Sequence, residues 1–459
     1  MAADRAQRLV SILRRRGPSR AADLLRELDV SQPVFSRLVK EAGADVVTIG
    51  RARATRYAAR RPLVTIDRPI PIHRIDAGAH PESIGVLHAI EPVGFWHAYN
   101  ERTPAYIREP AEDGLSEGLP YYVADMRPQG FLGRAIARAQ QGFMSLPLNP
   151  ESWSDDDILT YLALRGADCP GALVVGEASL EVFYRTVIAG PMVIPAARVA
   201  GDYPALAEKV LAGSAPGSSA GGEQPKFTAT VDAGNGPRAV IVKFSPAVEN
   251  AVHRRWADLL VTEHLALEVL REAGYLASRS RLIEAGNRVF LEVERFDRMG
   301  VFGRRDVVSL AALDDALYGS RDTWTLAAER LARDRRITLE DRARMEMLDL
   351  FAAFIANSDR HFGNLSFLPG DAALFALAPV YDMLPMAYAP VGTEIVVREF
   401  LPPTPPAGGS GQWADAARLA VAFWDSASGG SRISEEFRTL CRGNATAIRH
   451  TVDRVLAGG

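Results

Sequence analysis

The sequence predicts an α+β protein in which a small basic module precedes a larger acidic body. Three observations predict this class. Short apolar runs separated by turn residues fill residues 63–110 and are typical of strands. Two more strand-like runs, FTATVD and PRAVIVKFS, are joined by AGNG, which is a hairpin signal. From about residue 305 onward the apolar spacing is mostly helical.

Length and composition limit the class of protein. The chain has 459 residues, which allows about two to four domains. No apolar run reaches the ~18 residues of a membrane span, and the N-terminus lacks the apolar stretch of a secretory signal. Cys169 and Cys441 are the two cysteines, too few for a disulfide framework or a zinc site. We therefore expect a cytoplasmic protein with no membrane partner.

The N-terminal module combines basic charge with a recognisable order of elements. Residues 1–62 contain 14 Lys and Arg against 6 Asp and Glu, although the net charge of the whole chain is −3. Apolar spacing predicts helices over 5–16 and 20–28, with Ser19 placed to cap the second, and a third helix after Ser31. Two short strands follow in VVTIGRARATRYAA. This order resembles a winged helix-turn-helix domain, whose third helix enters the major groove of DNA.

The expected DNA contacts come from the outer face of the third helix and from the wing between the two strands. Arginines on a wing suit phosphate contacts, which give affinity rather than sequence specificity. The alternative is a small protein–protein module with a solvated basic face. The expected contact residues are Gln32, Ser36, Arg37 and Lys40 on the helix, and Arg51, Arg53 and Arg56 on the wing.

The body divides at stretches rich in Gly, Pro and Ser. The segment 214–227 is either a linker or a ligand loop, and 401–411 is a proline-rich surface loop. A long helix is expected over about 250–273. We expect three domains, the small basic one, a lobe with the ligand loop and a mostly helical C-terminal lobe, which span 1–62, 63–297 and 298–459.

Two segments near the C-terminal third carry the spacing of phosphoryl-transfer chemistry. In NSDRHFGN, Asp359 is followed five positions later by Asn364, and protein kinases use Asp-x-x-x-x-Asn in their catalytic loop. There the Asp accepts the proton of the attacking hydroxyl and the Asn binds magnesium. Asp382 in VYDMLPM follows an apolar run that can deliver a second hard oxygen ligand. Asn364 and Asp382 are therefore the expected Mg²⁺ ligands.

Two more features fit the same reaction. Lys243 lies inside the apolar run VIVKFS, where packing does not call for a charge, and kinases pair such a Lys with a helix Glu. Glu263 on the following helix is the expected partner, and Glu268 is a second candidate. The loop SSAGGEQPK can cradle phosphates with its amides, and Lys226 adds charge. Each feature is weak alone, but their order along the chain is that of a kinase.

These stretches resemble a known family. The segments SAGGEQPKF, IVKFS, VERFDR, NSDRHFGNLSF and PVYDMLPM are similar to the signature stretches of the HipA family of serine/threonine kinases, toxins of bacterial toxin–antitoxin pairs. The likeness spans most of residues 65–400 and includes GLPYYVADMRPQGFLGR. It is closest to the YjjJ-like branch, whose members carry their own N-terminal helix-turn-helix.

The resemblance implies a bilobed, protein-kinase-like fold with ATP between the lobes. It implies Asp359 as catalytic base, Lys243 on the phosphates, backbone groups of Glu294 and Phe296 on adenine, and Asp297 on the ribose. It also implies autophosphorylation of the Gly/Ser loop at Ser219 or its neighbour Ser218. The remaining nucleotide-binding residues that it implies are Ser219, Ala220, Gly221, Gly222, Glu223, Gln224, Lys226, His361, Asn364, Tyr381 and Asp382.

The sequence also departs from related patterns. It lacks G-x-G-x-x-G and D-F-G, so it is no eukaryotic-type protein kinase. A DNA-binding-like module is fused to the chain, whereas in the family's characterised operons a separate antitoxin supplies that part. The expected partners are a protein substrate such as an aminoacyl-tRNA synthetase, operator DNA, an antitoxin and a second copy of the chain.

Three functions remain open from the sequence. The first is a protein serine/threonine kinase that regulates itself through DNA binding. The second is a transcription regulator that uses the kinase-like body as an ATP-sensing scaffold. The third is a small-molecule kinase of the aminoglycoside phosphotransferase type, which shares Asp-x-x-x-x-Asn followed by Asp. The presence of Lys243, Asp359 and Asp382 argues against a dead enzyme, and VERFDR argues against the third function.

Overall fold

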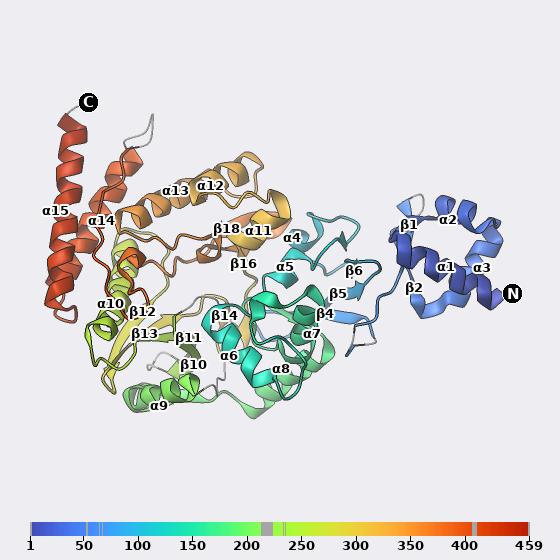
Figure 1. Ribbon diagram of the computed structural model, residues 1–459, viewed down its shortest axis with the longest axis horizontal. Coiled ribbons are helices and arrows are strands. Elements are labelled where there is room, and N and C mark those ends of the chain that lie inside the picture. Colours follow the sequence, from blue (N-terminus) through green and yellow to red (C-terminus); the bar gives the residue numbers. More distant parts are fainter. Residues whose placement is uncertain are drawn as a thin grey trace.

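The computed structural model places a small N-terminal module at one end of the molecule and the helices α14 and α15 at the other (Figure 1). Between them lie two five-stranded sheets and a helical C-terminal part. The structure describes residues 2–51, 54–63, 65–66, 68–212, 224–232, 234, 236–405 and 411–457.

The N-terminal module consists of three helices and a three-stranded sheet in the order β1-β3-β2. Leu9 and Leu13 lie in its core, as the helical spacing predicts. The sequence reading missed Phe35, which is fully buried and meets the Tyr57 ring edge-on at 5.0 Å. The elements are α1 (Ala2–Arg16), β1 (Ser19–Arg20), α2 (Ala21–Leu28), α3 (Gln32–Ala42), β2 (Val46–Ile49) and β3 (Arg56–Ala59).

The expected helix caps differ from those in the structure. Ser19 was expected to cap α2, but Arg20 holds the N-cap position and the Ser19 hydroxyl donates to the Gly17 carbonyl instead. The reason is that Ser19 is paired with Tyr57 in the sheet, which commits its backbone to a strand. Ser31 does hold the N-cap position of α3, without a hydrogen bond from its side chain to the helix.

An apolar junction joins this module to the next part of the chain. Val47, Ile49 and Ala58 from the hairpin pack with Ile90, and Trp96 covers them. Backbone hydrogen bonds extend the contact beyond β3. The Arg61 amide donates to the Ala89 carbonyl, and the Glu91 amide donates to the Ala59 carbonyl. The module is therefore packed against the body.

The middle part of the chain forms a five-stranded sheet in the order β7-β6-β5-β4-β8. The alternating runs of the sequence become its central antiparallel strands, and helices follow the outer strands. The strands are β4 (Ile70–Ile75), β5 (Pro81–Ala89), β6 (Phe95–Tyr99), β7 (Leu115–Ser116) and β8 (Leu173–Val175). The helices are α4 (Ala105–Arg108), α5 (Tyr121–Ala124), α6 (Gly130–Gln140), α7 (Asp155–Arg165) and α8 (Glu177–Ala189).

A second five-stranded sheet, in the order β12-β13-β11-β10-β9, carries the strand lysine. The hairpin predicted from AGNG forms as β10 and β11, and the long helix predicted over 250–273 forms as α10. The elements are β9 (Val193–Pro195), α9 (Val199–Leu211), β10 (Lys226–Asp232), β11 (Pro237–Phe244), α10 (Ala251–Glu272), β12 (Ser280–Ala285) and β13 (Arg288–Glu294).

The C-terminal part is mostly helical and also contains five short strands among its described residues. The pair β14 and β15 precedes the sheet β16-β17-β18, which supports the loop with Asp359. The strands are β14 (Arg298–Met299), β15 (Gly303–Arg304), β16 (Val308–Ser309), β17 (Ser366–Pro369) and β18 (Phe375–Leu377). The helices are α11 (Leu310–Leu317), α12 (Trp324–Arg333), α13 (Leu339–Phe354), α14 (Gly411–Gly429) and α15 (Glu435–Ala457).

The predicted α+β class is confirmed, since the sheets of the body are mainly antiparallel and a mostly helical part follows the two large ones. The predicted lobe 63–297 contains both five-stranded sheets, and the three domain boundaries stay predictions. One large apolar core runs from residue 63 to residue 448 and connects both sheets with the helical part. In the described part of the chain, no helix combines the length and apolarity that a membrane crossing requires.

Candidate active site

Three charged side chains from distant parts of the sequence meet at the second sheet. The Lys243 ammonium on β11 donates to Glu263 Oε1 on α10 over 2.6 Å, and it also contacts the Asp382 carboxylate. Lys226 lies directly opposite Lys243 in the β10–β11 ladder, so both side chains project from the same face. We call Lys243, Glu263 and Asp382 the Lys243 cluster.

Burial sets the electrostatics of the Lys243 cluster. Burial disfavours the charged ammonium, but the Asp382 and Glu263 carboxylates outweigh it and hold the pKa of Lys243 above its usual value. Burial raises the pKa of Glu263, which is fully buried. The pKa of Asp382 is lowered, because Lys243 and Lys226 overcome the effect of its burial. A charged ammonium is therefore held in place before any ligand binds.

The backbone around Asp382 is unusual. Asp382 has φ +53°, a left-handed conformation that costs a non-glycine residue about 1–2 kcal/mol. Asn357, which is almost fully buried, connects this segment to the other candidate loop: its side-chain amide donates to the Asp382 carbonyl over 3.4 Å and its Oδ1 accepts from the Asp359 amide over 3.0 Å. The sequence reading missed this bridging role of Asn357.

The loop with Asp359 is fixed by its backbone while its carboxylate stays accessible. The Asp359 carbonyl accepts from Asn364 Nδ2 over 2.7 Å, and the Asp359 side chain is 53% exposed. His361 Nδ1 accepts from the Gly363 amide, which assigns the ring proton to Nε2, 3.9 Å from Asp359 Oδ1. This arrangement suits a group that accepts a proton from a bound molecule.

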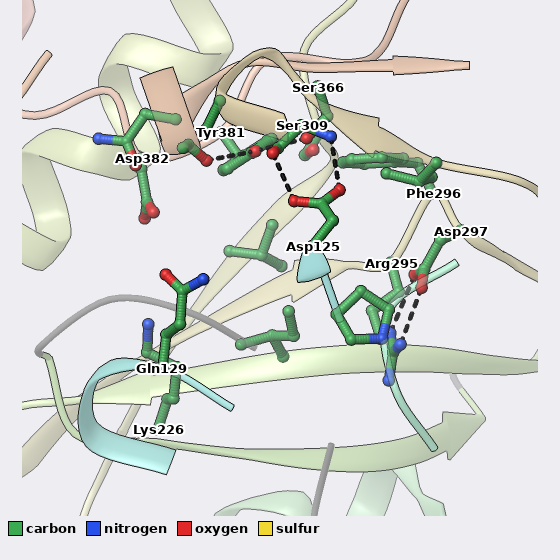
Figure 2. A pocket seen from close by; sticks show the side chains of 18 of the residues that line it. Asp125, Gln129, Lys226, Arg295, Phe296, Asp297, Ser309, Ser366, Tyr381 and Asp382 are labelled. Atoms are coloured by element: carbon green, nitrogen blue, oxygen red, sulfur yellow. Dashed lines mark hydrogen bonds and ion pairs between the residues drawn. The ribbon is translucent and has the colours of Figure 1, made fainter. Parts of the chain in front are cut away.

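A cavity of about 240 Å³ opens beside the Lys243 cluster. Asp382 lies at one end of it and Asp297 at the other, while Lys226 lies across from Tyr381 (Figure 2). The Tyr381 hydroxyl donates to the Gly363 carbonyl over 2.9 Å and lies 2.7 Å from Ser366 Oγ, which fixes its ring against the loop. Asn364, His361, Glu294 and Phe296 also line this cavity.

Comparison with known proteins identifies the family of the chain. Residues 66–184 match the family described as YjjJ-like toxin, middle domain, and residues 218–444 match the HipA-like C-terminal domain. The chain is 37% identical over 451 residues to Toxin YjjJ of Escherichia coli (strain K12), covering 96% of this chain and 98% of that protein. The chain belongs to the YjjJ-like branch of the HipA toxin family.

The fold of the family is also found in a solved structure. The HipA chain in the complex of Shewanella oneidensis MR-1 HipA with HipB and operator DNA matches with a TM-score of 0.51 and 16% identity. The match covers 84% of this chain and 97% of that chain. At this level of identity the likeness concerns the fold alone, and it confirms the predicted HipA-like architecture.

In the VERFDR segment, one of the backbone groups expected to contact adenine already has a hydrogen-bond partner within the protein. The Glu294 amide already donates to the Arg279 carbonyl over 2.8 Å, so its carbonyl is the backbone group left for a base. Phe296 lines the cavity with its ring 5.8 Å from that of Tyr381. The adenine contacts expected of Glu294 and Phe296 stay predictions.

Asp297 takes part in an ion cluster. Its carboxylate accepts from Arg295 over 2.8 and 3.0 Å, from Arg298 over 2.6 Å and from the Gly171 amide over 2.9 Å. Arg298 also binds Asp168, so this Asp297 cluster (Asp168, Arg295, Asp297 and Arg298) connects the middle part to the segment after β13. Burial opposes the charge on Asp297, but the two arginines lower its pKa far below the ordinary value. The ribose contact expected of Asp297 would require it to share these partners.

The middle part contributes cavity residues that the sequence reading did not single out. Asp125, Arg127 and Gln129 follow α5 and line the cavity. Asp125 accepts from the Ser309 amide over 2.8 Å and from its hydroxyl, which couples α5 to the start of α11; Figure 2 shows this pair beside Tyr381. Burial raises the pKa of Asp125. All three lie in the stretch GLPYYVADMRPQGFLGR that carries the family resemblance. No spacing assigns them a role there, because only packing between the two parts of the chain brings them to the cavity.

The residues expected to hold Mg²⁺ share this cavity. Asn364 and Asp382 both line it, and amide and carboxylate oxygens are ligands that Mg²⁺ accepts. Asn364 donates its amide to the loop, which leaves its oxygen for a cation. Within the described ranges, no group of three or more His, Cys, Asp and Glu side chains forms a metal-binding cluster. The pair therefore fits a metal completed by phosphates and water.

The remaining expected residues lie beside the cavities, on the N-terminal module, or outside the described part of the chain. Gln224 and Lys226 lie at the start of β10, beside the cavities. On the N-terminal module, Arg51 is exposed. The Arg56 guanidinium instead forms an ion pair with Asp113 of the middle part, with 3.3 Å between Nη1 and Oδ2. The residues Gln32, Ser36, Arg37 and Lys40 are exposed along α3. The expected site residues Ser218, Ser219, Ala220, Gly221, Gly222 and Glu223 and the wing residue Arg53 lie outside the described residues.

Proposed function

We propose that this protein is an ATP-dependent protein serine/threonine kinase of HipA type. The observation that carries the proposal is the Lys243 cluster at the end of a cavity that Asn364 and Asp382 also line. A buried ammonium with two carboxylates beside a cavity is the constellation that binds and polarises phosphates. Lys226 adds a second positive charge to the same face.

Each side chain of the site has a role in this proposal. Lys243 neutralises phosphate oxygens, and Glu263 holds its ammonium in place. Asp359 accepts the proton of the attacking hydroxyl, because its carboxylate is accessible and its backbone is fixed. Asn364 and Asp382 would hold Mg²⁺, which offsets phosphate charge. Asn357 and Tyr381 position the two loops.

Transfer of labelled phosphate tests the proposal. The full-length chain is incubated with γ-labelled ATP and Mg²⁺, alongside Asp359→Asn, which keeps the size of the side chain. We expect label on Ser218 or Ser219 of the Gly/Ser loop in the wild type and a loss of at least about 100-fold in the variant. A wild-type chain that binds DNA but acquires no label, and labels no protein, would contradict kinase activity and favour the regulator with an ATP-sensing body.

We further propose that the N-terminal module binds double-stranded DNA as a winged helix-turn-helix domain. Two observations support it: three helices precede a hairpin, and the polar residues of α3 point outward while Phe35 and Leu38 point into the core. The related HipA of Shewanella oneidensis MR-1 was solved with HipB and operator DNA. In this chain the fused module would take over the DNA contact, with a separate antitoxin as an additional partner.

A salt titration tests DNA binding. Affinity of the full-length chain for duplex DNA should fall steeply with salt, and Arg37→Ala should weaken it. Loss of one phosphate contact lowers the slope of log K against log salt by about 1, whereas loss of a base contact weakens one sequence more than others. Arg56→Ala should change the slope little, since Arg56 already faces Asp113. Binding that does not respond to salt would contradict the proposal.

A further inference from the structure

A second cavity adjoins the first at the residues expected to hold the phosphates. It has a volume of about 310 Å³ and shares Lys226, Asn364 and Asp382 with the first cavity. Asp359 lines the second cavity and is absent from the lining of the first. In phosphoryl transfer the acceptor and the leaving group stand on opposite sides of the transferred group, roughly in line. The two cavities meet at Asn364 and Asp382, so an acceptor in one and a nucleotide in the other would lie on opposite sides of the transferred phosphate.

The walls of the second cavity are mainly apolar. Phe244 and Leu384 are buried, and Trp256 and Met386 are half-buried. They come from β11, from α10 and from the segment after Asp382, so the fold converges on this surface from three places. Covering such a surface with an apolar group is favourable, because it removes apolar area from water. The cavity therefore favours a ligand with a large apolar group close to its reacting atom.

One polar group in the second cavity lacks a partner. Gln224 Nε2 is buried and, among the described residues, has no hydrogen-bond partner. A buried donor left unpaired is destabilising, so a ligand that supplies an acceptor is favoured there. The carbonyl of a polypeptide backbone is such an acceptor.

We propose that this cavity is the acceptor subsite, and that it binds a polypeptide whose target serine or threonine is flanked by a large apolar side chain. The inference rests on the proposed kinase function and adds the class of its substrate. The apolar neighbour occupies the space beside Trp256 and Met386. Gln224, which the family resemblance implies as a nucleotide-binding residue, lines the second cavity and not the first, and here it donates to the peptide backbone instead. The target hydroxyl then faces Asp359 at the junction of the two cavities.

The chemical step balances at this junction. The hydroxyl oxygen of the acceptor forms a bond to the γ-phosphorus of ATP. The bond from that phosphorus to the bridging oxygen breaks, and ADP leaves with the electron pair. The hydroxyl proton passes to Asp359. The third function considered from the sequence, a small-molecule kinase of the aminoglycoside phosphotransferase type, is disfavoured because a polar sugar acceptor would leave most of the apolar wall uncovered. That wall consists of Phe244, Trp256, Leu384 and Met386.

The test is a comparison of serine-centred peptides that differ in the residue on either side of the serine. With the full-length chain and Mg-ATP, we expect kcat/KM for Leu, Met or Phe neighbours to exceed that for Gly or Asp by at least about 10-fold. Met386→Glu should lower kcat/KM for the Leu peptide and raise it for a Lys peptide, which inverts the preference. A variant that merely folded poorly would lower both values in the same proportion.

A matched control and a parallel measurement separate this inference from the proposed function. Leu339→Glu introduces the same charge at an exposed position and should leave the peptide preference unchanged. Binding of a fluorescent ATP analogue is measured in each variant. Absent nucleotide binding would overturn the kinase proposal. If the wild-type chain binds the nucleotide and labels its own Gly/Ser loop, the kinase proposal stands. Equal kcat/KM for all neighbours, no transfer to any peptide, or an unchanged preference in Met386→Glu would then overturn the acceptor subsite alone.

Discussion

Asp382 and Asp297 line the same cavity, and each carboxylate lies beside positively charged side chains. Asp382 contacts Lys243, retains 23% side-chain exposure and has a left-handed backbone. Asp297 is bound by two arginines and an amide, and its side chain is 9% exposed. Both carboxylates are ionised, since the neighbouring cations lower both pKa values against the effect of burial. They differ in how many hydrogen-bond positions are already filled.

This difference leaves Asp382 able to bind a new ligand and commits Asp297 to contacts within the protein. Asp382 keeps lone pairs for a new ligand and is held in a costly backbone conformation, which is common at functional sites. Asp297 has both oxygens hydrogen-bonded and connects segments that are far apart in the sequence. We therefore expect the two residues to respond differently to the same substitution.

The largest expected effect is on activity at Asp382. Asp382→Asn removes the proposed metal ligand and one anion beside Lys243, so phosphate transfer should fall by at least about 10³-fold. The melting temperature should change little, because Asn tolerates the left-handed conformation and Lys243 keeps Glu263. Transfer rate and thermal unfolding are measured on the same protein. Activity within 10-fold of the wild type would remove Asp382 from the metal site.

The second effect is on stability at Asp297. Asp297→Asn leaves buried Arg295 and Arg298 with a single carboxylate, Asp168, and should destabilise the protein by about 3–5 kcal/mol. Phosphate transfer well below the melting temperature should stay within about 10-fold of the wild type. If instead the KM for ATP rises sharply while thermal unfolding is unchanged, Asp297 contacts the nucleotide and the ribose contact implied by the family resemblance is correct.

A smaller effect is expected at Glu263. Glu263→Gln keeps an oxygen acceptor for Lys243 but removes one charge, while Asp382 still holds the ammonium. Partners that orient a functional group typically contribute about 10–100-fold to activity, and we expect the lower end of that range. The rate of labelled phosphate transfer at saturating ATP checks this. Complete loss of activity would show that Asp382 alone cannot hold Lys243.

The smallest effect is a difference in pH dependence. The pKa of Asp297 is lowered in the folded protein, so its contribution to stability is present above the ordinary Asp value near 4 and is lost as pH falls further. The gap in melting temperature between wild type and Asp297→Asn should therefore be wide at pH 7 and narrow below pH 4. A gap that is constant from pH 7 to pH 3 would show that charge pairing is not the source of the stability.

Much of the fold follows from local pattern. The AGNG hairpin and the helical spacing over 250–273 predicted β10, β11 and α10 within a few residues. The ion-pair partner of Lys243 could not be fixed from local pattern alone, since both Glu263 and Glu268 were candidates on the sequence. At about 100° per residue the two glutamates point about 140° apart, and the structure selects Glu263 while Glu268 pairs with Arg271.

The parts of the site that sequence reading missed depend on packing. Asp125 reaches the cavity beside Ser309, a contact between distant segments that no spacing reveals. Asn357 stands in NSDRHFGN itself and its bond to the Asp359 amide is local, but its bond to the Asp382 carbonyl joins two separate segments. For Asp297 a local signal existed. Arg295 lies two residues before it and Arg298 directly after it, and opposite charges at such positions indicate a local ion cluster as readily as a ligand contact.

The apolar junction between the N-terminal module and the middle part has a consequence for cooperativity. Ile90 and Trp96 are covered by Val47, Ile49 and Ala58, so separating the two parts exposes apolar surface on both. Melting of the module would then remove support from the sheet that carries Trp96, and calorimetry should record the two parts in one transition. A chain shortened to begin at residue 63 would present this surface to water and tend to aggregate. Ligands of either part should therefore raise the melting temperature of the other.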